Sequence, residues 1–357
     1  MDNMHSLPIS VRFSSSSPPN EYDDQLRLAK ALVDNGSDIL KELLELQSKG
    51  WNDESAEKHF QKQRQTSDNP PPELTMIWFR MMKGLLREID TRLKCIPAKA
   101  PTDFLDLGCC PGGFSSYILD KNPNANGTGV SLPVADGGHE FSLEEHHHSR
   151  FNLFSANLTY YQLGPTIIDN GRLQVLPFDI ITGSFDVVLL DGHQLRTQRS
   201  ALPWDYDRLL ISQLILGLQS VKDGGTIIMK LPMPHKPVSA RILYLFNIIS
   251  SRTLRWKPNL MHANRGTFYA VAKGVGKGQG GHKIPIILGA LKALWVNLTF
   301  GGEEGSGRYM VPEDLDFLIS MDDLVSHHLD WLTKLGTPLW KVQKAALEKF
   351  YDGKHIK

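Results

Sequence analysis

Cysteine is scarce in this sequence of 357 residues, with only Cys95, Cys109 and Cys110 present. Two of the three are adjacent in the chain, which is poor geometry for a disulfide. The sequence therefore lacks the even, spaced set of cysteines that marks a small disulfide-bonded secreted domain. This usage is typical of a reducing compartment, so we expect an intracellular protein, cytoplasmic or nuclear, with an organelle as the alternative.

Long hydrophobic runs are also missing. The first residues contain no apolar core of the kind that a secretory signal requires. The longest apolar stretch, residues 284–300, is interrupted by Lys292 and is short for a membrane span. We therefore expect a soluble protein that has no membrane partner.

Acidic residues are absent from one long segment. The chain carries 39 acidic and 39 basic residues, yet no Asp or Glu lies between Asp223 and Glu303. That segment holds eleven lysines and arginines. We expect the acid-free segment, residues 224–302, to contribute a face that binds the phosphates of RNA. The alternative is a chance excess of positive charge that is spread over several faces of the fold.

The two ends of the chain are predicted to be extensions of a central domain. Residues 1–20 are rich in Ser and Pro and are predicted to be disordered. Residues 21–96 have helical spacing of apolar residues, with breaks at Gly36 and at the prolines of 70–72. Residues 275–284 are rich in Gly and predict a flexible linker. The last part, 285–357, predicts helices over 285–298, 312–335 and 338–351.

Residues 97–274 alternate between short apolar runs and helical segments, which predicts a mostly parallel sheet with helices on both faces. In such folds a ligand binds at the carboxyl ends of the strands. The predicted strands are 104–107, 127–131, 173–178, 185–190, 226–231 and 268–272, and the predicted helices are 113–119, 209–221 and 238–250.

The most informative segment is residues 104–115, which read FLDLGCCPGGFS. An apolar strand runs into glycines and then into a helix. The glycines allow the backbone to approach a ligand closely, and the helix N-terminus offers unpaired N–H groups. The glycine spacing departs from that of a dinucleotide-binding turn, and no Gly-Lys-Ser/Thr follows for a phosphate loop.

This segment resembles the first motif of the FtsJ-like (RrmJ-type) ribose 2′-O-methyltransferases, D-L-G-x-x-P-G-G-W/F-S. About half of the chain, from residue 83 to residue 273, takes part in the resemblance. Any one of the further matches is weak, but six in order are strong. The further matching segments are 129–133, 177–179, 185–192, 224–230, and 257–258 together with 268–274.

The resemblance implies a Rossmann-like α/β fold, doubly wound with a mostly parallel sheet (a class I methyltransferase), and S-adenosylmethionine as cofactor. It implies RNA as the partner, through methyl transfer to a ribose 2′-hydroxyl, with the RNA class (ribosomal, transfer or messenger cap) left open. Beside Asp191, the cofactor-binding residues that it implies are Asp106, Gly108, Pro111, Gly112, Gly113, Phe114, Ser131 and Asp179.

The family works with a Lys-Asp-Lys-Glu tetrad. The resemblance implies that Lys83 takes the first position, Asp191 the second and Lys230, the base, the third. A lysine can act as a base only when burial or a nearby cation lowers its pKa. The fourth position falls on Thr267 in place of Glu, and Ser131 stands where the family has an acid after the second strand.

Because of these two departures from the family pattern, two other functions remain possible. One is a methyltransferase of the same fold that acts on a small molecule or a protein, with an acceptor pocket roofed by the C-terminal helices. Another is a catalytically weak protein that binds RNA or the cofactor. No metal is expected, because the three histidines of 146–148 lack the spacing of four that ligands on one helix face need.

Overall fold

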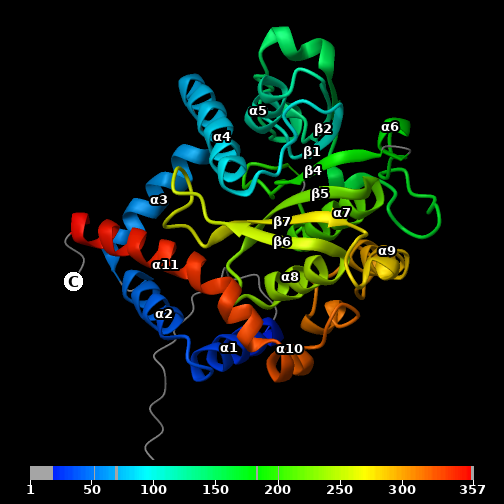
Figure 1. Ribbon diagram of the computed structural model, residues 1–357. Helices are drawn as coiled ribbons and strands as arrows, with labels where there is room; N and C mark the ends of the chain where they lie inside the picture. Colours follow the sequence, from blue (N-terminus) through cyan, green and yellow to red (C-terminus); the bar gives the residue numbers. More distant parts are fainter. Residues whose placement is uncertain (1–18, 52, 69–70, 182–183, 200, 355–357) are drawn as a thin grey trace, which may run out of the picture.

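The computed structural model describes residues 19–51, 53–68, 71–181, 184–199 and 201–354. The expectation of disorder for residues 1–20 lies outside these ranges, except for Pro19 and Asn20, which begin the first helix. Figure 1 shows a central twisted sheet with helices packed on both faces. The predicted fold class, a doubly wound α/β sheet with helical extensions, is confirmed.

The sheet has seven strands in the order β3-β2-β1-β4-β5-β7-β6. All neighbours pair in parallel except β7, which is antiparallel to both β5 and β6. Near-continuous apolar sequence, such as FDVVLL in β4, is what a strand buried on both faces requires. The strands are β1 (Thr102–Leu107), β2 (Ala125–Ser131), β3 (Phe151–Ser155), β4 (Phe185–Leu190), β5 (Val221–Pro232), β6 (Ser250–Trp256) and β7 (Thr267–Val275).

The direction of winding changes between β1 and β4. The chain runs outward from β1 to β2 and β3, and then returns to β4 and β5 on the other side of β1. A crevice forms at such a switch point, outside the carboxyl ends of the strands. The segments that follow β1 and β4 are therefore the places to look for a ligand site.

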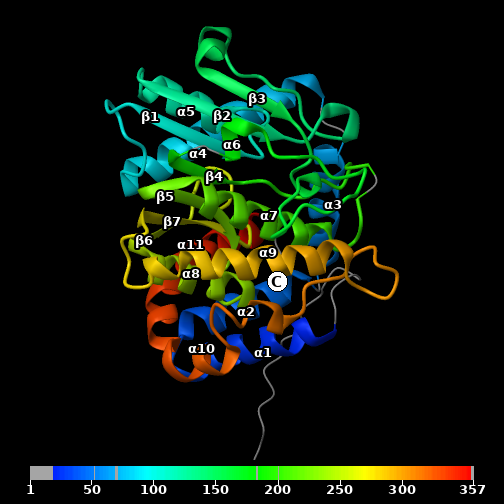
Figure 2. The ribbon, with the colours of Figure 1, turned by 90° about the vertical axis from the view of Figure 1, so that its right-hand side faces the viewer.

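Helices cover both faces of the sheet (Figure 1 and Figure 2). One face packs against α4 (Pro72–Leu93) and α5 (Gly113–Lys121), and the opposite face packs against α7 (Asp205–Ser220), α8 (Pro237–Ile249) and α9 (Ile284–Phe300). The α9 helix and its lead-in, Gly281–Phe300, are long and apolar enough to cross a membrane by length and composition. Leu291, Trp295 and Leu298 of this helix are buried in the core.

The two ends of the chain meet in one further layer beneath α8. There α1 (Pro19–Asp34) and α2 (Asp38–Trp51) lie beside α10 (Met321–His327) and α11 (Leu329–Lys354), in blue and red in Figure 1. Arg241 of α8 is buried in this layer, and its guanidinium donates to the carboxylate of Asp316 at 2.8 Å. The helix α3 (Glu54–Asp68) leads from this layer back toward the sheet.

Three sequence-based expectations are wrong. Residues 173–178 are not a strand, and Gln174 makes only an isolated bridge with Tyr161; the third strand is β3, whose short sequence FNLFS carried little signal. Residues 276–280 are not a free linker, because Gly278 and Gly280 donate to backbone carbonyls of α8 and a short 3-10 helix, η4 (Gly281–Lys283), follows. Lastly, no helix break occurs at Pro338, since α11 continues through it.

Candidate active site

A cleft of about 660 Å³ opens at the carboxyl ends of β1, β4 and β5. Pockets of roughly 300–1,000 Å³ are usual for small-molecule and cofactor sites. The turn after β1, the segment 191–197 after β4 and the end of β5 supply its walls, and α4 closes one side. Of the predicted residues, Gly108, Pro111, Asp191 and Lys230 line this cleft.

Lys230 and Asp191 form an ion pair in the cleft. Lys230 is the tenth residue of β5 and Asp191 directly follows β4, so the parallel pairing of these two strands brings them together. The Lys230 Nζ lies 2.9 Å from Oδ1 of Asp191 and 3.2 Å from its backbone carbonyl oxygen. The carboxylate is buried, and the lysine side chain is 17% exposed. The lysine therefore reaches the cleft while its amino group is held in one place.

Tyr269 completes this pair from the neighbouring strand β7. It lies opposite Lys230 in the antiparallel register, and its hydroxyl donates to Asp191 Oδ1 at 3.0 Å. Burial, followed by the negative charge of Asp191, raises the pKa of Tyr269 well above its ordinary value, so it remains a donor. Tyr269 is not among the predicted site residues, although its segment is part of the resemblance.

Two histidines beside Lys230 were also missed. His193 lies two residues after Asp191, with Nδ1 3.5 Å from Lys230 Nζ, and His262 lines the same cleft. The positive charge of Lys230, together with burial, lowers the pKa of His193 to about 4. Burial and then Lys230 lower the pKa of His262 to about 4 as well. Both imidazoles are therefore neutral at pH 7 and add no positive charge beside Lys230.

The glycine-rich turn has the backbone geometry that a closely bound ligand needs. Gly108 has φ of +84°, and a Cβ there would lie 2.5 Å from the Cα of Gly192. Gly112 has φ of +108° and precedes the first turn of α5. Gly113 has a different role, because a Cβ there would lie 2.4 Å from the carbonyl oxygen of Phe79 in α4. It allows the two helices to pack closely.

Two predicted residues of this segment are buried beside the cleft and do not line it. Asp106 accepts a hydrogen bond from the hydroxyl of Ser115 at 2.7 Å, and its other carboxylate oxygen has no hydrogen-bond partner among the described residues. Burial raises the pKa of Asp106 to about 7. Phe114 is buried in the core against Tyr269, with ring centroids 6.1 Å apart.

A smaller hollow of about 60 Å³ continues from the cleft toward β2 and β3. It is lined by Ser131, whose hydroxyl accepts from the Cys110 N–H at 3.3 Å, and by Asn157, which follows β3. Asp179 lines neither hollow: it lies in the short helix α6 (Phe178–Ile181) and accepts from Asn152. Because the third strand is 151–155, the residue after that strand on the ligand side is Asn157 and not Asp179.

Lys83 is not brought to Lys230 and Asp191. Its Nζ lies 2.6 Å from a carboxylate oxygen of Asp120 and 2.8 Å from one of Glu144. On α4 the cleft is lined by Trp78, Met82 and Leu85, with the spacing of one helical face. A shift of one residue turns a helical side chain by about 100°. The position that faces the cleft is therefore Met82, an apolar residue.

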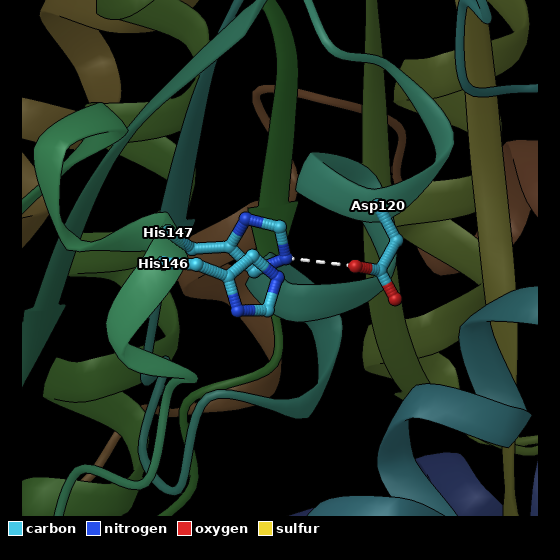
Figure 3. A group of neighbouring side chains, drawn as sticks. All are labelled: Asp120, His146 and His147. Atoms are coloured by element: carbon cyan, nitrogen blue, oxygen red, sulfur yellow. Dashed lines mark hydrogen bonds and ion pairs between the residues drawn. The ribbon is translucent and has the colours of Figure 1, made fainter.

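The histidine run of 146–148 belongs to the same ion-pair network as Lys83. His147 is buried, and its Nε2 lies 2.7 Å from an Asp120 carboxylate oxygen (Figure 3). The other ring nitrogen of His147 accepts a hydrogen bond from the Arg150 guanidinium at 2.9 Å. The ring atoms of His146 and His147 and the Asp120 carboxylate lie within 4.8 Å of one another. Since His147 has both nitrogens engaged and Asp120 is paired with Lys83, the chemistry of this group is that of a structural salt bridge.

Thr267, at the position of the tetrad glutamate, lines the cleft. Its hydroxyl oxygen is buried and has no hydrogen-bond partner among the described residues. Its backbone carbonyl accepts from Lys257, which is buried and also donates to the carbonyls of His262 and Arg265, at 2.6–2.9 Å. Burial lowers the pKa of Lys257 to about 7. Lys257 therefore holds the loop between β6 and β7 against the cleft.

The acid-free segment does not form a single basic face. Arg241 and Lys257 are buried and make structural bonds, and Arg255 donates to the carbonyl of Leu335. Lys230 and Arg265 are the basic residues of this segment that line the cleft. The expectation of one phosphate-binding face over 224–302 is therefore wrong, because the segment winds through both layers of the fold.

The sequence profile described as FtsJ-like methyltransferase matches residues 86–275, more than half of the chain. The chain belongs to the FtsJ-like methyltransferase family. The predicted family is thus confirmed. The Lys230–Asp191 pair, the glycine-rich turn after β1 and most of the cleft lie within the matched residues, whereas the parts of the cleft wall that α3 and α4 supply precede them.

Several curated relatives resemble the same half of the chain. The cap-specific mRNA (nucleoside-2′-O-)-methyltransferase 1 of Xenopus laevis is 26% identical over 194 residues, which are 49% of this chain and 21% of that protein. The inactive cap-specific mRNA (nucleoside-2′-O-)-methyltransferase 1B of Caenorhabditis briggsae is 25% identical over 179 residues, 48% of this chain and 21% of that protein. The chain thus spans about a fifth of the length of these relatives.

Solved structures also resemble the chain. A Plasmodium falciparum protein described as a ribosomal RNA methyltransferase is 17% identical, with a TM-score of 0.37, over 54% of this chain and 96% of that chain. The N-methyltransferase NodS of Bradyrhizobium japonicum is 12% identical, with a TM-score of 0.35, over 54% of this chain and 97% of that chain.

Proposed function

We propose that the protein transfers a methyl group from S-adenosylmethionine to a ribose 2′-hydroxyl of RNA, with Lys230 as the base. The observation that carries this proposal is the Lys230–Asp191–Tyr269 arrangement in a cleft at the carboxyl ends of the strands. It is an amine held at 2.9 Å by a buried carboxylate, in a cleft that the glycine-rich turn after β1 also lines.

The residues around the turn after β1 fit S-adenosylmethionine. Gly108 and Gly112 have positive φ values that L side chains rarely adopt, the turn after β1 lies against Gly192, and the N-terminus of α5 faces the same turn. The buried carboxylate oxygen of Asp106 that lacks a partner is a polar atom still able to bind a cofactor amine through a neighbour or a water. Ser131 and Asn157 offer polar groups in the adjoining hollow. When bound, the cofactor supplies a methyl group already activated by its sulfonium.

Lys230 carries out the proton transfer in this proposal. The cleft residues would hold the 2′-hydroxyl against the methyl group that the cofactor supplies, and the hydroxyl proton would pass to the neutral amine of Lys230. Because the base is the neutral amine, Lys230 must give a proton to solvent before each transfer. Asp191 then keeps the nitrogen in position, and Tyr269 keeps Asp191 in position. Alignment of the acceptor with the methyl group is the main remaining requirement.

Messenger RNA is the RNA class that the names of the relatives support, since the curated relatives are cap-specific. A role in ribosomal RNA processing, also expected from the resemblance, has no comparable support. An mRNA substrate agrees with the expected nuclear or cytoplasmic location.

A small-molecule or protein acceptor was expected to bring an acceptor pocket roofed by the C-terminal helices. Among the described residues that line the cleft, none comes from 281–354, and Asp68 at the end of α3 contributes instead. This favours the RNA acceptor.

A catalytically weak or inactive protein is the second candidate. Three observations favour it: Thr267 replaces the tetrad glutamate, Lys83 is engaged by Asp120 and Glu144, and one relative is itself named inactive. In this case the cleft would bind cofactor and RNA without turnover.

The two candidates are separated by transfer of radiolabelled methyl from S-adenosylmethionine to total cellular RNA. We expect label to enter RNA with the wild type and with Lys222→Ala, a lysine at the other end of β5, and to vanish with Lys230→Ala. Digestion to nucleosides then identifies the methylated ribose. If the wild type binds the cofactor and no label enters RNA, the enzymatic proposal fails and the second candidate replaces it.

A further inference from the structure

Arginine side chains from separate parts of the chain meet at the mouth of the cleft. Arg196 follows β4, Arg265 lies in the loop between β6 and β7, and Arg64 lies in the last turns of α3. Arg196 and Arg265 line the same cleft as Lys230. Arg64 precedes the residues that match the family, so this meeting point is built partly by a segment outside the family match.

The end of α3 contacts both the loop that follows β4 and the loop between β6 and β7. Arg196 donates to the backbone carbonyl of Arg64 at 3.0 Å, and Arg265 donates to the side-chain oxygen of Gln63. Both guanidiniums therefore contact neighbouring residues of one helical turn. The positive charges of Arg64 and Arg196, after loss of hydration, lower the pKa of Arg265, as expected for three cations held close together.

Asp68, the last residue of α3, forms an ion pair with the guanidinium of Arg196. Its carboxylate accepts from Arg196 Nε at 2.9 and 3.1 Å and from Nη2 at 2.8 Å. This is the forked geometry in which arginine also binds phosphate. Asp68 lines the cleft, and its side chain is 30% exposed, so another anion can reach the same place.

Like charges that are held close together repel one another, and anionic partners offset this repulsion. Here Glu57 pairs with Arg64, and Asp68 pairs with Arg196. A phosphate that displaces Asp68 would be contacted by Arg196 and Arg265 together, at the rim of the site that holds Lys230.

We propose that Arg196 and Arg265, with Arg64 beside them, form a site at the mouth of the cleft that binds a phosphate of the RNA. In the absence of RNA, the carboxylate of Asp68 occupies this site. The proposal rests on the RNA substrate of the proposed function. The phosphate comes either from an internal phosphodiester or from the 5′ end of the RNA. In both cases α3 acts as part of the substrate site, and its Asp68 is a competitor of the substrate.

The test is the affinity for a short fluorescein-labelled single-stranded RNA, measured by anisotropy over a range of salt concentrations. We expect Arg196→Ala and Arg265→Ala each to weaken binding about tenfold and to lower the salt slope by roughly 0.7, the value for one contact to single-stranded RNA. Arg252→Ala, an exposed arginine of β6, should bind like the wild type. Asp68→Asn should bind RNA more tightly, because the competing charge is gone while the side-chain shape remains.

The sign of the Asp68→Asn effect decides between two roles. If Asp68 merely orients Arg196, the variant loses affinity, and the proposal is overturned. It is also overturned if Arg196→Ala and Arg265→Ala match Arg252→Ala. Calorimetric binding of S-adenosylmethionine shows whether the cleft is intact in each variant, and Arg196→Lys and Arg265→Lys, which keep the charge and lose the fork, should recover part of the affinity.

Two further comparisons locate the phosphate and separate this proposal from the enzymatic one. RNA with a 5′-triphosphate and RNA with a 5′-hydroxyl are compared: a loss of affinity in the arginine variants that is confined to the former indicates the 5′ end, and an equal loss indicates a phosphodiester. Methyl transfer is then measured with the same RNA. If RNA binding depends on the two arginines but no methyl group is transferred, the phosphate site is supported and the enzymatic proposal fails. If methyl transfer is unchanged in the Arg196 and Arg265 variants, only the phosphate site is overturned.

Discussion

Tyr269 and Lys230 contact the same carboxylate oxygen of Asp191, the hydroxyl from 3.0 Å and the amine from 2.9 Å. The three residues come from three adjacent strands, β4, β5 and β7, so the order of the sheet itself assembles the group. A carboxylate held by a buried donor keeps one orientation, and it transmits that orientation to the lysine. The hydroxyl of Tyr269 is thus expected to act on the reaction through Asp191.

Tyr269→Phe should lower kcat by between about ten and a hundredfold, because a hydrogen bond to a charged group contributes roughly 1.5–3 kcal/mol. The KM for RNA should not change, since Tyr269 acts behind Asp191. Tyr244→Phe, on α8, makes the same chemical change away from the cleft and serves as the control. The measurement is steady-state methyl transfer by both variants. Equal kcat values for the two variants would show that the Tyr269 hydroxyl does not contribute to the reaction.

Thr267→Glu restores the residue type of the family tetrad, yet we expect turnover to fall by roughly tenfold or more. A carboxylate placed in the cleft beside Asp191 is a like charge, and Lys83 is too strongly engaged elsewhere to offset it. The double variant Met82→Lys with Thr267→Glu supplies a cation on the cleft face of α4 and should exceed either single variant. A gain in turnover by Thr267→Glu alone would instead mean that Lys83 can turn into the cleft.

The sequence predicted the sheet and the strand-end residues well for a physical reason. Asp191 and Lys230 follow directly from strands whose apolar runs are unambiguous, and parallel pairing leaves little freedom in where such residues lie. Lys83 does not reach the site as predicted, because a sequence pattern locates a helical residue only to within a turn of its helix. Asp179 lay away from the site because β3 is short and alternates buried and exposed residues weakly. Arg196 and Asp68 are separated by 128 positions in the sequence, and no local sequence pattern predicts a contact over such a separation.

Lys257→Met should destabilise the protein by about 3 kcal/mol or more, because three backbone carbonyls, of His262, Arg265 and Thr267, lose their shared donor. Methionine keeps most of the volume, so the loss reports the donor and not a cavity. Lys273→Met, which removes a single bond to the carbonyl of Lys94, is the matched control and should cost less. Urea unfolding measures both, and equal costs would contradict the role given to Lys257.

Gly113→Ala should destabilise the protein by about 1–3 kcal/mol, the usual cost of overpacking. The added methyl group would meet the Phe79 carbonyl oxygen and the Lys83 backbone nitrogen of α4, neither of which can turn aside. Gly171→Ala is the control, since a Cβ there meets nothing within 4 Å. Thermal unfolding of the two variants should differ clearly; a Gly113→Ala protein as stable as the control would mean that α4 can move away from α5.

His235 makes the stability of the protein depend on pH. It is buried next to Trp340 of α11, with ring centroids 6.2 Å apart, and burial lowers its pKa to about 3. The unfolded chain therefore binds a proton near pH 6.5 that the folded protein does not bind until about pH 3. Between these values the unfolded state holds more protons, so stability falls as pH falls through the window.

The expected loss from His235 alone is about 2 kcal/mol between pH 7 and pH 5, because each unit of pH below 6.5 costs about 1.36 kcal/mol. His193 and His262, whose pKa values are lowered to about 4, add to the same slope. In His235→Leu, urea unfolding should show a shallower decline over this range than in the wild type, while His282→Leu, an exposed histidine, should not. If the two variants show the same pH dependence, either the ring of His235 is protonated in the folded state or α11 leaves it before the rest of the protein unfolds.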